Sequence, residues 1–373
     1  MNRRSPYKDH FLHARDRAYL NTGAEGLIPK VGLEAMQQYG LDKSLGAKGR
    51  ERFYAVEEQA RALVADFIGG RKDEIAFLSN ASEGINRLCN ALSWGAGDEV
   101  VIDDLEFPSN VLPWIKLRRC GVNVKVVQAV DRTLRVEDFE RAVTDRTRLI
   151  SVSLVSYKSG FRADIQRLGE LAHSVRAFLM VDATQGLGCT PFSVQGVDFM
   201  VASSYKWLLA PHGLGVVYCR RDLLDRLEPR SIGWRSVEDI FAPDRFERYD
   251  LRDGAAKMEL GMPNFPALYA LNAGIRYLQG IGLKSIERNA LDLGTVLIEA
   301  FEDMGLDVLT PIDRTKRAGI VSFEHPEVKR IAAELEQDHV FVWGGDGRIR
   351  VSTHLYNDME DVERLLGSLQ KIL

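Results

Sequence analysis

Short, almost wholly apolar runs alternate with amphipathic helical patterns along most of this chain, and this alternation restricts the possible folds most. The apolar runs are EIAFL (74–78), DEVVI (98–102), VNVKVV (122–127), RLISVSLV (148–155), AFLMVD (177–182), VDFMVAS (197–203) and LGVVYC (214–219). The helical patterns cover 56–70, 82–94, 109–119, 136–143 and 165–175. Strands that are apolar on both faces and alternate with helices form mostly parallel sheets covered on each side. The sequence therefore predicts an α/β domain with a mostly parallel, seven-stranded sheet.

The pattern changes after about residue 262. A long helix is predicted in ALYALNAGIRYLQGIG (267–282), and strand candidates follow near 319–323, 339–343 and 348–352. A smaller α+β domain fits this region best. We expect an N-terminal arm at 1–17, a large domain at 18–262 and a C-terminal small domain at 263–373, in which 263–282 is the linking helix.

Charge and cysteine content narrow the possible partners and compartment. The 49 Lys and Arg residues against 53 Asp and Glu give a formal net charge of −4, which offers no bulk attraction to nucleic acid or an anionic membrane. We find no signal peptide and no apolar run of transmembrane length. The four cysteines have no paired spacing typical of a disulfide framework or a zinc site. We therefore expect a cytoplasmic protein without a metal.

Lys206, in VASSYKWLLAPHGLG, comes directly after an apolar strand and beside aromatic residues. A lysine is by default a solvated surface residue. At the carboxyl end of a buried strand, however, desolvation would lower its pKa and make the amine a nucleophile able to form a Schiff base. Ligands of such sheets bind outside the carboxyl ends of the strands, so Lys206 is a candidate catalytic residue.

Asp182 ends the apolar strand AFLMVD, where a buried carboxylate needs a partner. Taken alone, Asp182 fits a helix N-cap best. It also fits a carboxylate that pairs with a protonated pyridine nitrogen and so makes a cofactor ring an electron sink. Gln185, three residues on, could hydrogen-bond a phenolic oxygen of the same ring.

The segment LSNASEGIN (78–86) predicts a strand, a turn of small residues and a helix that begins near Ser82. Free amides and a hydroxyl at a helix N-terminus suit one phosphate group. Ser82 fits an ordinary capping box equally well. No GxGxxG or P-loop pattern occurs here, which argues against a dinucleotide or a nucleoside triphosphate.

These motifs together resemble the class V branch of fold-type I pyridoxal-phosphate enzymes. That branch includes cysteine desulfurases, kynureninase, isopenicillin N epimerase-like proteins and several aminotransferases. The resemblance extends from AYLNTGAEGLIP (18–29) to RIRVSTHLYNDMEDVERLL (348–366), with the motifs in the family's order. It implies pyridoxal 5'-phosphate as cofactor, an amino-acid substrate and a homodimer with active sites at the interface.

By this resemblance, Lys206 is the Schiff-base lysine, and Asp182 holds the pyridine nitrogen. Gln185 then holds the ring hydroxyl oxygen. The phosphate-binding groups that the resemblance implies are the Ala81 amide and the hydroxyls of Ser82 and Ser203.

Three further positions receive a role from the resemblance. Phe107, in LEFPSN, falls where the family stacks an aromatic ring over the cofactor. Arg350 falls where an arginine forks onto the substrate carboxylate, a task that suits a guanidinium. Asn21 lies in the segment that lines the substrate side. Without the resemblance, Phe107 reads as a core residue and Arg350 as a surface charge.

Some positions depart from the family pattern. Tyr205 stands where many relatives have histidine; its hydroxyl can donate to the phosphate, or its ring packs under the lysine loop. Met262, in MELGMPN (258–264), replaces a threonine that reaches the neighbouring subunit's phosphate. Tyr157 and Lys158 stand where desulfurases place an asparagine, and they either face the substrate or are a packed tyrosine and a solvated lysine.

Desulfurases of this group carry a nucleophilic cysteine shortly before the carboxylate-binding arginine. Here DHVFVWGGDGRIR (338–350) contains none, and the four cysteines lie elsewhere, at Cys89, Cys120, Cys189 and Cys219. We therefore expect that the chain is not a Cys-dependent desulfurase. Cofactor-driven elimination of a sulfur group needs no such thiol.

The expected reaction takes place at Cα of an amino acid, with the carboxylate on Arg350 and Lys206 as general base. A class V aminotransferase or a β-eliminating C–S lyase is the first hypothesis. A kynureninase-like hydrolase or an epimerase is the alternative, and an epimerase needs a second base, for which Tyr157, Lys158 and His354 are candidates. The alternative in which the chain is not an enzyme is a catalytically silent protein that binds pyridoxal phosphate.

Overall fold

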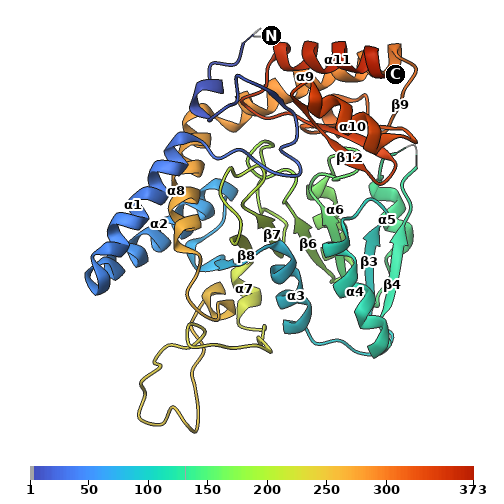
Figure 1. Cartoon of the computed structure of the whole chain (residues 1–373). Coiled ribbons are helices and arrows are strands. Elements are labelled where there is room, and N and C mark those ends of the chain that lie inside the picture. Colours follow the sequence, from blue (N-terminus) through green and yellow to red (C-terminus); the bar gives the residue numbers. More distant parts are fainter. Residues whose placement is uncertain (1–3, 131) are drawn as a thin grey trace.

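The centre of the molecule is a seven-stranded sheet in the order β2–β8–β7–β6–β5–β3–β4 (Figure 1). The structure is a computed structural model and describes residues 4–130 and 132–373. Strand β8 is antiparallel to both of its neighbours, and the other neighbouring pairs are parallel. The strands are β2 (Ile75–Leu78), β3 (Glu99–Asp103), β4 (Asn123–Val127), β5 (Thr147–Ser153), β6 (Phe178–Asp182), β7 (Phe199–Ser203) and β8 (Gly215–Cys219). The predicted fold, a mostly parallel sheet of seven strands, is confirmed.

The strands are apolar on both faces because alternate side chains enter two separate cores. On β3, Val101 belongs to one core, while Val100 and Ile102 belong to the other. Helices α2, α5, α6 and α8 cover the first core, and α3, α4 and α7 cover the second. The helices of this part are α1 (Lys30–Ser44), α2 (Arg50–Ile68), α3 (Ala81–Ala91), α4 (Leu112–Lys116), α5 (Val136–Ala142), α6 (Ile165–Ser174), α7 (Arg221–Leu224) and α8 (Phe265–Ile281).

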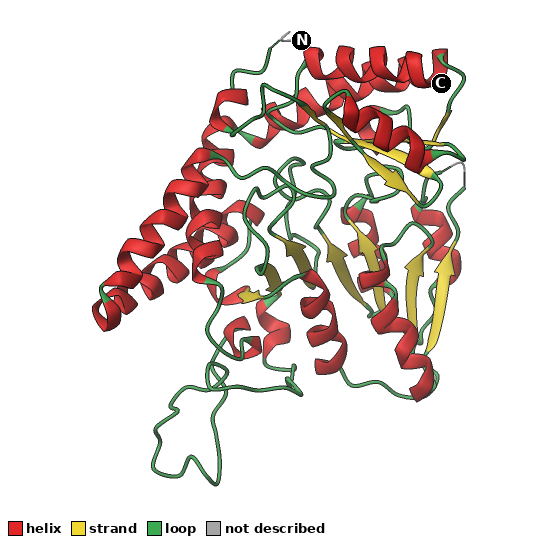
Figure 2. Ribbon diagram, viewed as in Figure 1, coloured by secondary structure: helices red, strands yellow, loops and turns green. Residues whose placement is uncertain are grey.

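The C-terminal unit is a second layer, formed by a four-stranded antiparallel sheet and three helices (Figure 2). Its elements are α9 (Leu283–Asp303), β9 (Asp307–Val308), β10 (Ile320–Glu324), α10 (Val328–Gln337), β12 (Trp343–Gly345), β13 (Arg348–Ser352) and α11 (Met359–Ile372). Near the start of the chain, β1 (Ala18–Tyr19) pairs in parallel with β11 (Val340–Phe341). Ala18 and Leu20 pack in the core of this unit. The boundaries of the predicted arm and domains stay a prediction.

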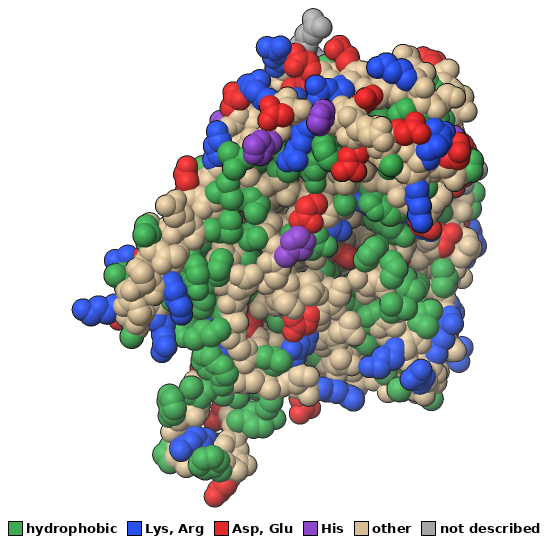
Figure 3. Space-filling view, viewed as in Figure 1, with side chains coloured by type: hydrophobic (Ala, Val, Ile, Leu, Met, Phe, Trp, Pro, Cys, Tyr) green, Lys and Arg blue, Asp and Glu red, His purple; other side chains and the backbone are tan. Residues whose placement is uncertain are grey.

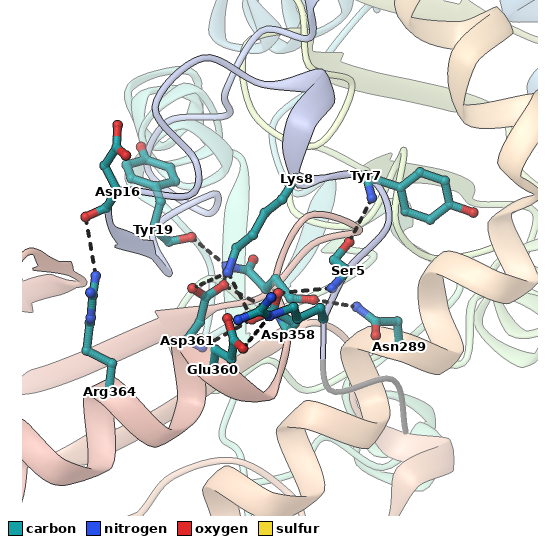
Figure 4. Close-up of polar contacts among 12 residues, drawn as sticks. Ser5, Tyr7, Lys8, Asp16, Tyr19, Asn289, Asp358, Glu360, Asp361 and Arg364 are labelled. Carbon is teal, nitrogen blue, oxygen red and sulfur yellow. Dashed lines mark hydrogen bonds and ion pairs between the residues drawn. The ribbon is translucent and has the colours of Figure 1, made fainter.

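A buried ion cluster holds the N-terminal segment against the start of α11 (Figure 4). Lys8 Nζ lies 2.9 Å from Asp358 Oδ1 and 2.7 Å from Asp361 Oδ1. The Ser5 amide donates to the other oxygen of Asp358 at 2.9 Å. Burial raises the pKa of Asp361 to about 6, although Lys8 opposes that shift. Each charge of this cluster has a partner within the chain.

One loop extends away from the body of the protein at the bottom of Figures 1 and 3. We call residues 237–251 the projecting loop, because an antiparallel bridge between Val237 and Leu251 closes its base. Phe241 and Phe246 on this loop are 78% and 88% exposed. None of the helices in the described ranges is both long and apolar enough to cross a membrane.

Candidate active site

The predicted site residues gather at one edge of the large sheet because parallel strands end at the same edge. Asp182 ends β6 and pairs in register with Ser153, the last residue of β5. Ser203 ends β7 and pairs with Gly215 of β8. A Cβ at Gly215 would lie 2.5 Å from the backbone of Asn80, so the start of α3 can approach this edge only where a glycine stands.

Lys206 lies just beyond β7 and is largely buried. Burial, followed by the positive charge of Arg350, lowers its pKa to about 8. Its Nζ is 5.8 Å from the ring centroid of Phe107, and no described residue offers it a hydrogen-bond acceptor. A substantial fraction of this amine is therefore neutral near pH 8 and able to act as a nucleophile or base.

The N-terminal segment packs directly on the lysine loop. The Gly26 amide donates to the Tyr205 carbonyl oxygen at 2.9 Å. A Cβ at Gly26 would lie 1.9 Å from the Lys206 carbonyl oxygen. Only glycine permits this approach, so the segment that resembles the family's substrate side lies against Lys206.

Asp182 is a buried carboxylate with little compensation from the protein. Burial raises its pKa, while hydrogen bonds from Thr184 and the charge of Lys206 oppose the shift. Its Oδ1 accepts from the Thr184 amide at 2.9 Å, and the carboxylate forms no ion pair in the described part of the chain. A cationic N–H group placed here would pair with it and favour the ionised carboxylate.

Gln185 is held in one orientation by two hydrogen bonds. Its Nε2 donates to the Gly23 carbonyl oxygen, and its Oε1 accepts from Trp207 Nε1, each at 2.9 Å. One N–H of the amide remains able to donate. Trp207 and Gly23 were not among the predicted site residues, because only tertiary packing brings them to Gln185.

The predicted phosphate groups lie at the N-terminus of α3. The Ala81 amide donates to Ser203 Oγ at 3.2 Å, and Ser82 Oγ lies 2.7 Å from Ser109 Oγ. The N-cap residue of α3 is Asn80, whose side chain accepts from the Glu83 amide at 2.8 Å. The capping interpretation of Ser82 is therefore wrong, and Ser82 lies in the first turn, where free amides favour an anion.

Arg350 comes from β13 in the C-terminal unit but faces the lysine. A Cβ at Gly23 would lie 3.3 Å from both Arg350 Cζ and Gln185 Oε1, so the two side chains flank the same glycine. Burial, together with the charge of Arg348, lowers the pKa of Arg350 to about 10. Its Nη1 donates to the Tyr157 carbonyl oxygen at 3.3 Å.

Aromatic side chains border the site. Phe107 is 44% exposed, and its ring meets Tyr157 edge to face, with centroids 5.1 Å apart. Tyr205 stacks on His212 at 4.2 Å, and His212 Nε2 lies 3.2 Å from Glu25 Oε2. This exposed histidine and its glutamate were not predicted, since nothing in the local sequence links position 25 to position 212.

The candidate second bases differ in their surroundings. His354 is fully buried, lies 3.0 Å from the Trp207 carbonyl oxygen through Nε2, and has its pKa lowered by burial to about 4. It is neutral near pH 7 and packs between the rings of Trp207 and Tyr356. Lys158 Nζ donates to the Asp104 carbonyl oxygen at 3.2 Å. Asn21 Oδ1 is buried without a partner in the described chain.

A buried acid pair behind the site was also missed. Glu106 accepts from Asn110 Nδ2 at 2.9 Å and from Ser153 Oγ at 2.6 Å. Burial raises the pKa of Asp103 to about 7 and that of Glu106 well above its usual range. The only local signal for this pair is the glutamate next to Phe107 in LEFPSN. Through Ser153, Glu106 contacts the end of β5, where Ser153 pairs with Asp182 of β6.

Comparisons with known proteins give a consistent result. Residues 18–365 match the profile of the family described as Aminotransferase class-V. The probable cysteine desulfurases of Pyrococcus abyssi and Methanothermobacter thermautotrophicus are 30% and 31% identical, over 95% and 96% of this chain and 94% and 95% of their own lengths. The apo structure of a cysteine desulfurase from Thermococcus onnurineus NA1 superposes with a TM-score of 0.92 at 30% identity, covering 100% of this chain and 98% of that one.

These relatives correct the predicted reaction. The missing cysteine in 338–350 led us to expect that the chain is not a Cys-dependent desulfurase, and that transamination or elimination takes place instead. Proteins named cysteine desulfurase match nearly the whole chain, so this expectation is wrong. It failed because it judged the reaction from one absent side chain in a short segment. The likeness to desulfurases extends over the whole fold and does not depend on that segment.

Proposed function

Because the chain belongs to the class V aminotransferase family, we propose that it removes the sulfur of cysteine, forming alanine and passing the sulfur to a thiol as a persulfide. The chain is an enzyme, and its cofactor is pyridoxal phosphate. The observation that carries the proposed reaction is the 30–31% identity to probable cysteine desulfurases over 95–96% of the chain. The geometry at the strand ends supports it.

The residues at this edge fit the cofactor. Asp182 offers a buried carboxylate that forms no ion pair within the described chain, which suits a protonated ring nitrogen. Lys206 offers a desolvated amine for an aldehyde carbon, and the start of α3 suits a phosphate. When bound, pyridoxal phosphate supplies an electron sink for the charge that develops on the substrate.

Each polar residue has a task in this proposal. Arg350 holds the substrate carboxylate, and Lys206 moves the Cα proton, because a pKa of about 8 lets the amine both accept and return a proton. Ionised Asp182 keeps the ring nitrogen protonated. The other residues proposed to line the site are Asn21, Ala81, Ser82, Phe107, Tyr157, Gln185, Ser203 and Tyr205.

We also propose a homodimer with the active sites at the interface. Exposed apolar side chains support it: Trp234 and Met262 are each about half exposed, and hydrophobic side chains crowd the projecting loop in Figure 3. Contiguous exposed apolar surface of this kind is typical of an interface. Met262 carries no hydroxyl, so the threonine contact of relatives to the neighbouring phosphate has no counterpart there. Light scattering on purified protein gives the mass directly.

A cytoplasmic location is part of the same proposal. All four cysteines are free thiols, which suits a reducing compartment. Fractionation of cells that produce the protein tests this point.

The reaction is tested on the purified holoprotein with L-cysteine and dithiothreitol. Alanine and sulfide are expected in equal amounts. The holoprotein is also expected to show an absorption band of the cofactor, and reduction with borohydride is expected to attach the cofactor permanently to Lys206. Mass spectrometry of a reaction without dithiothreitol identifies any cysteine of the chain that carries the persulfide. Lys206→Ala is the control and is expected to form alanine at least about 10³-fold more slowly. Pyruvate in place of alanine, or no reaction with cysteine, would overturn the proposal.

A further inference from the structure

A fully buried tryptophan connects the candidate site to the C-terminal unit. Trp207 follows Lys206 directly and is 0% exposed. Its indole lies against the residue before β10, since a Cβ at Gly319 would lie 3.0 Å from two carbons of the ring. The ring of His354 stacks on the indole with centroids 5.5 Å apart. Close packing on these sides leaves the indole little freedom to move.

The backbone of Trp207 is held as well. The Leu355 amide donates to His354 Nδ1 at 2.7 Å, so the ring proton of this neutral histidine is on Nε2. His354 Nε2 then donates to the Trp207 carbonyl oxygen at 3.0 Å. Gly188 lies against the same carbonyl oxygen, because a Cβ there would be 2.2 Å from it. With ring and backbone both held, the indole N–H has a fixed direction.

That N–H determines the orientation of the Gln185 side-chain amide. An indole N–H can only donate, and a backbone carbonyl oxygen can only accept. Gln185 Oε1 accepts from Trp207 Nε1, and Gln185 Nε2 donates to the Gly23 carbonyl oxygen, each at 2.9 Å. The reversed amide would place two donors together at Trp207 and two acceptors together at Gly23. The hydrogen-bond partners therefore determine which end of the amide is oxygen and which is nitrogen.

The group that Gln185 offers to a ligand is consequently a donor. Its Nε2 carries a second hydrogen, which makes no hydrogen bond within the described chain. The side chain belongs to a residue that is only 8% exposed. A buried donor without an acceptor is costly, and an acceptor on a ligand removes that cost. The ring oxygen of pyridoxal phosphate is an acceptor of this kind.

We propose that Trp207 is a positioning residue, which holds the Gln185 amide so that its free N–H faces the ring oxygen of pyridoxal phosphate. Trp207 acts through Gln185 and does not itself bind the cofactor. His354, a candidate second base, holds the indole in this arrangement. The inference rests on the cofactor of the proposed function and not on its reaction, because it concerns binding before any amino acid arrives.

The test compares two compounds in titrations of the apoprotein. One is pyridoxal phosphate, and the other is 3-deoxypyridoxal phosphate, which keeps the aldehyde and the phosphate but has no ring oxygen. In Trp207→Phe the preference for pyridoxal phosphate should fall about 10-fold, because Gln185 Oε1 loses its donor and the amide turns to find another. The affinity for the deoxy compound should stay within about twofold, since that compound cannot use the hydrogen bond.

Two further variants show whether Trp207 acts through the amide. Gln185→Met should remove most of the preference, and Trp207→Phe added to Gln185→Met should lower it no further. Trp94→Phe is the matched control, because it also deletes an indole N–H. Trp94 lies beyond the C-terminal end of α3, where its Nε1 donates to the Cys89 carbonyl oxygen at 2.8 Å. This control should leave the preference unchanged.

An analogue of tryptophan protects the test against misfolding. 3-Benzothienylalanine at position 207 keeps the shape of the ring, has sulfur in place of the N–H and should give the same loss of preference as Trp207→Phe. An unchanged preference with this analogue would overturn the inference. So would equal losses of affinity for both compounds in Trp207→Phe, or a further loss of preference in the double variant. A failure of the proposed function is separate, because these titrations contain no cysteine and report no alanine.

Discussion

Two groups of buried charged residues in this protein differ in whether each charge has a partner of opposite sign. The paired cluster consists of Glu57, Arg61, Arg235 and Glu259, in which two cations meet two carboxylates. Arg61 alone donates to Glu57 and Glu259 at 2.8 Å each. The site cluster consists of Asp182, Lys206, Arg348 and Arg350. It has three cations and one buried carboxylate, and among the described residues only the exposed Asp346 forms an ion pair with one of these cations, Arg348. Removing charges from water is costly unless partners replace the water.

This difference indicates that one cluster stabilises the fold and that the other is available to a ligand. The paired cluster joins α2 to the segment before α8. Each of its arginines forms ion pairs with both carboxylates, and only Arg235 Nε is buried without an acceptor among the described residues. The site cluster keeps donors and an amine without partners, and the protein bears that energetic penalty where a ligand can relieve it. The candidate site therefore differs from the paired cluster in having buried cations without a buried carboxylate partner.

The largest expected effect is in the site cluster. Lys206→Ala should lower the rate of alanine formation by about 10³-fold or more, since general base catalysis alone contributes 10²- to 10⁴-fold. The absorption band of the lysine-bound cofactor should also disappear, and borohydride should no longer attach the cofactor to residue 206. Steady-state kinetics and absorption spectra of the two proteins provide the measurement. A variant that retains a tenth of the wild-type rate would show that another residue moves the proton.

Breaking the paired cluster should affect stability rather than chemistry. Glu259→Gln leaves Arg61 and Arg235 with one carboxylate and should lower the free energy of unfolding by about 3 to 5 kcal/mol. Urea unfolding measures this change. Glu58→Gln removes the half-exposed partner of Arg61 and is the matched control, expected to cost less than about 1 kcal/mol. Equal effects of the two substitutions would contradict the comparison.

Removing the unpaired cation should stabilise the apoprotein. The pKa of Lys206 is about 8 when folded, against an ordinary 10.5, so the unfolded state binds the proton more readily between these values. Stability then rises with pH from 8 to 10.5, and the full penalty is present below pH 8. Lys206→Met should therefore raise the free energy of unfolding at pH 7 by up to about 3 kcal/mol, and this gain should vanish near pH 10.5.

Lys8→Met is the control for this measurement, because Lys8 is buried against two carboxylates. Urea unfolding of both apoproteins at pH 7 and pH 10 should give opposite signs at pH 7, with a loss of stability for Lys8→Met. Two losses of similar size would show that Lys206 is not strained in the folded protein.

The smallest expected effect is at the border of the site cluster. Phe107→Leu removes the ring that we propose stacks over the cofactor. It should weaken cofactor binding about 3- to 10-fold, since one aromatic ring contact contributes roughly 0.5–1.5 kcal/mol. Titration of the apoprotein with pyridoxal phosphate measures the change. Phe246→Leu, on the projecting loop, should leave that affinity unchanged. An unaltered affinity in Phe107→Leu would remove Phe107 from the site.

The strands could be predicted from sequence nearly to the residue, as for 177–182 against Phe178–Asp182 of β6. The reason is that each strand buries both faces and so carries an unbroken apolar run. Helix α1 (Lys30–Ser44) was missed, because only two of its residues, Gly32 and Asp42, are buried and its apolar pattern is weak. Its position follows from packing along α8 and not from its own periodicity.

The residues of the candidate site also differ in whether the sequence alone predicts them. Lys206 and Asp182 could be found from sequence because a polar residue directly after an apolar strand is a local signal. Arg348 could not, since its importance lies in buried nitrogens without acceptors. Arg350 entered the prediction only through a family resemblance. In the structure its guanidinium lies beside Gly23, which Gln185 also flanks, although Arg350 comes from the C-terminal sheet.

The sequence by itself determined the sheet, the order of its strands along the chain and the lysine at a strand's end, because apolar periodicity and strand ends are properties of neighbouring residues. Only the tertiary structure decided which charges are left without partners, because pairing depends on residues hundreds of positions apart. Lys8 meets Asp358 and Asp361 across the whole chain, while Arg348 meets only a nearby aspartate and keeps a free edge. Whether a buried charge is structural or is available to a ligand is decided by that long-range placement.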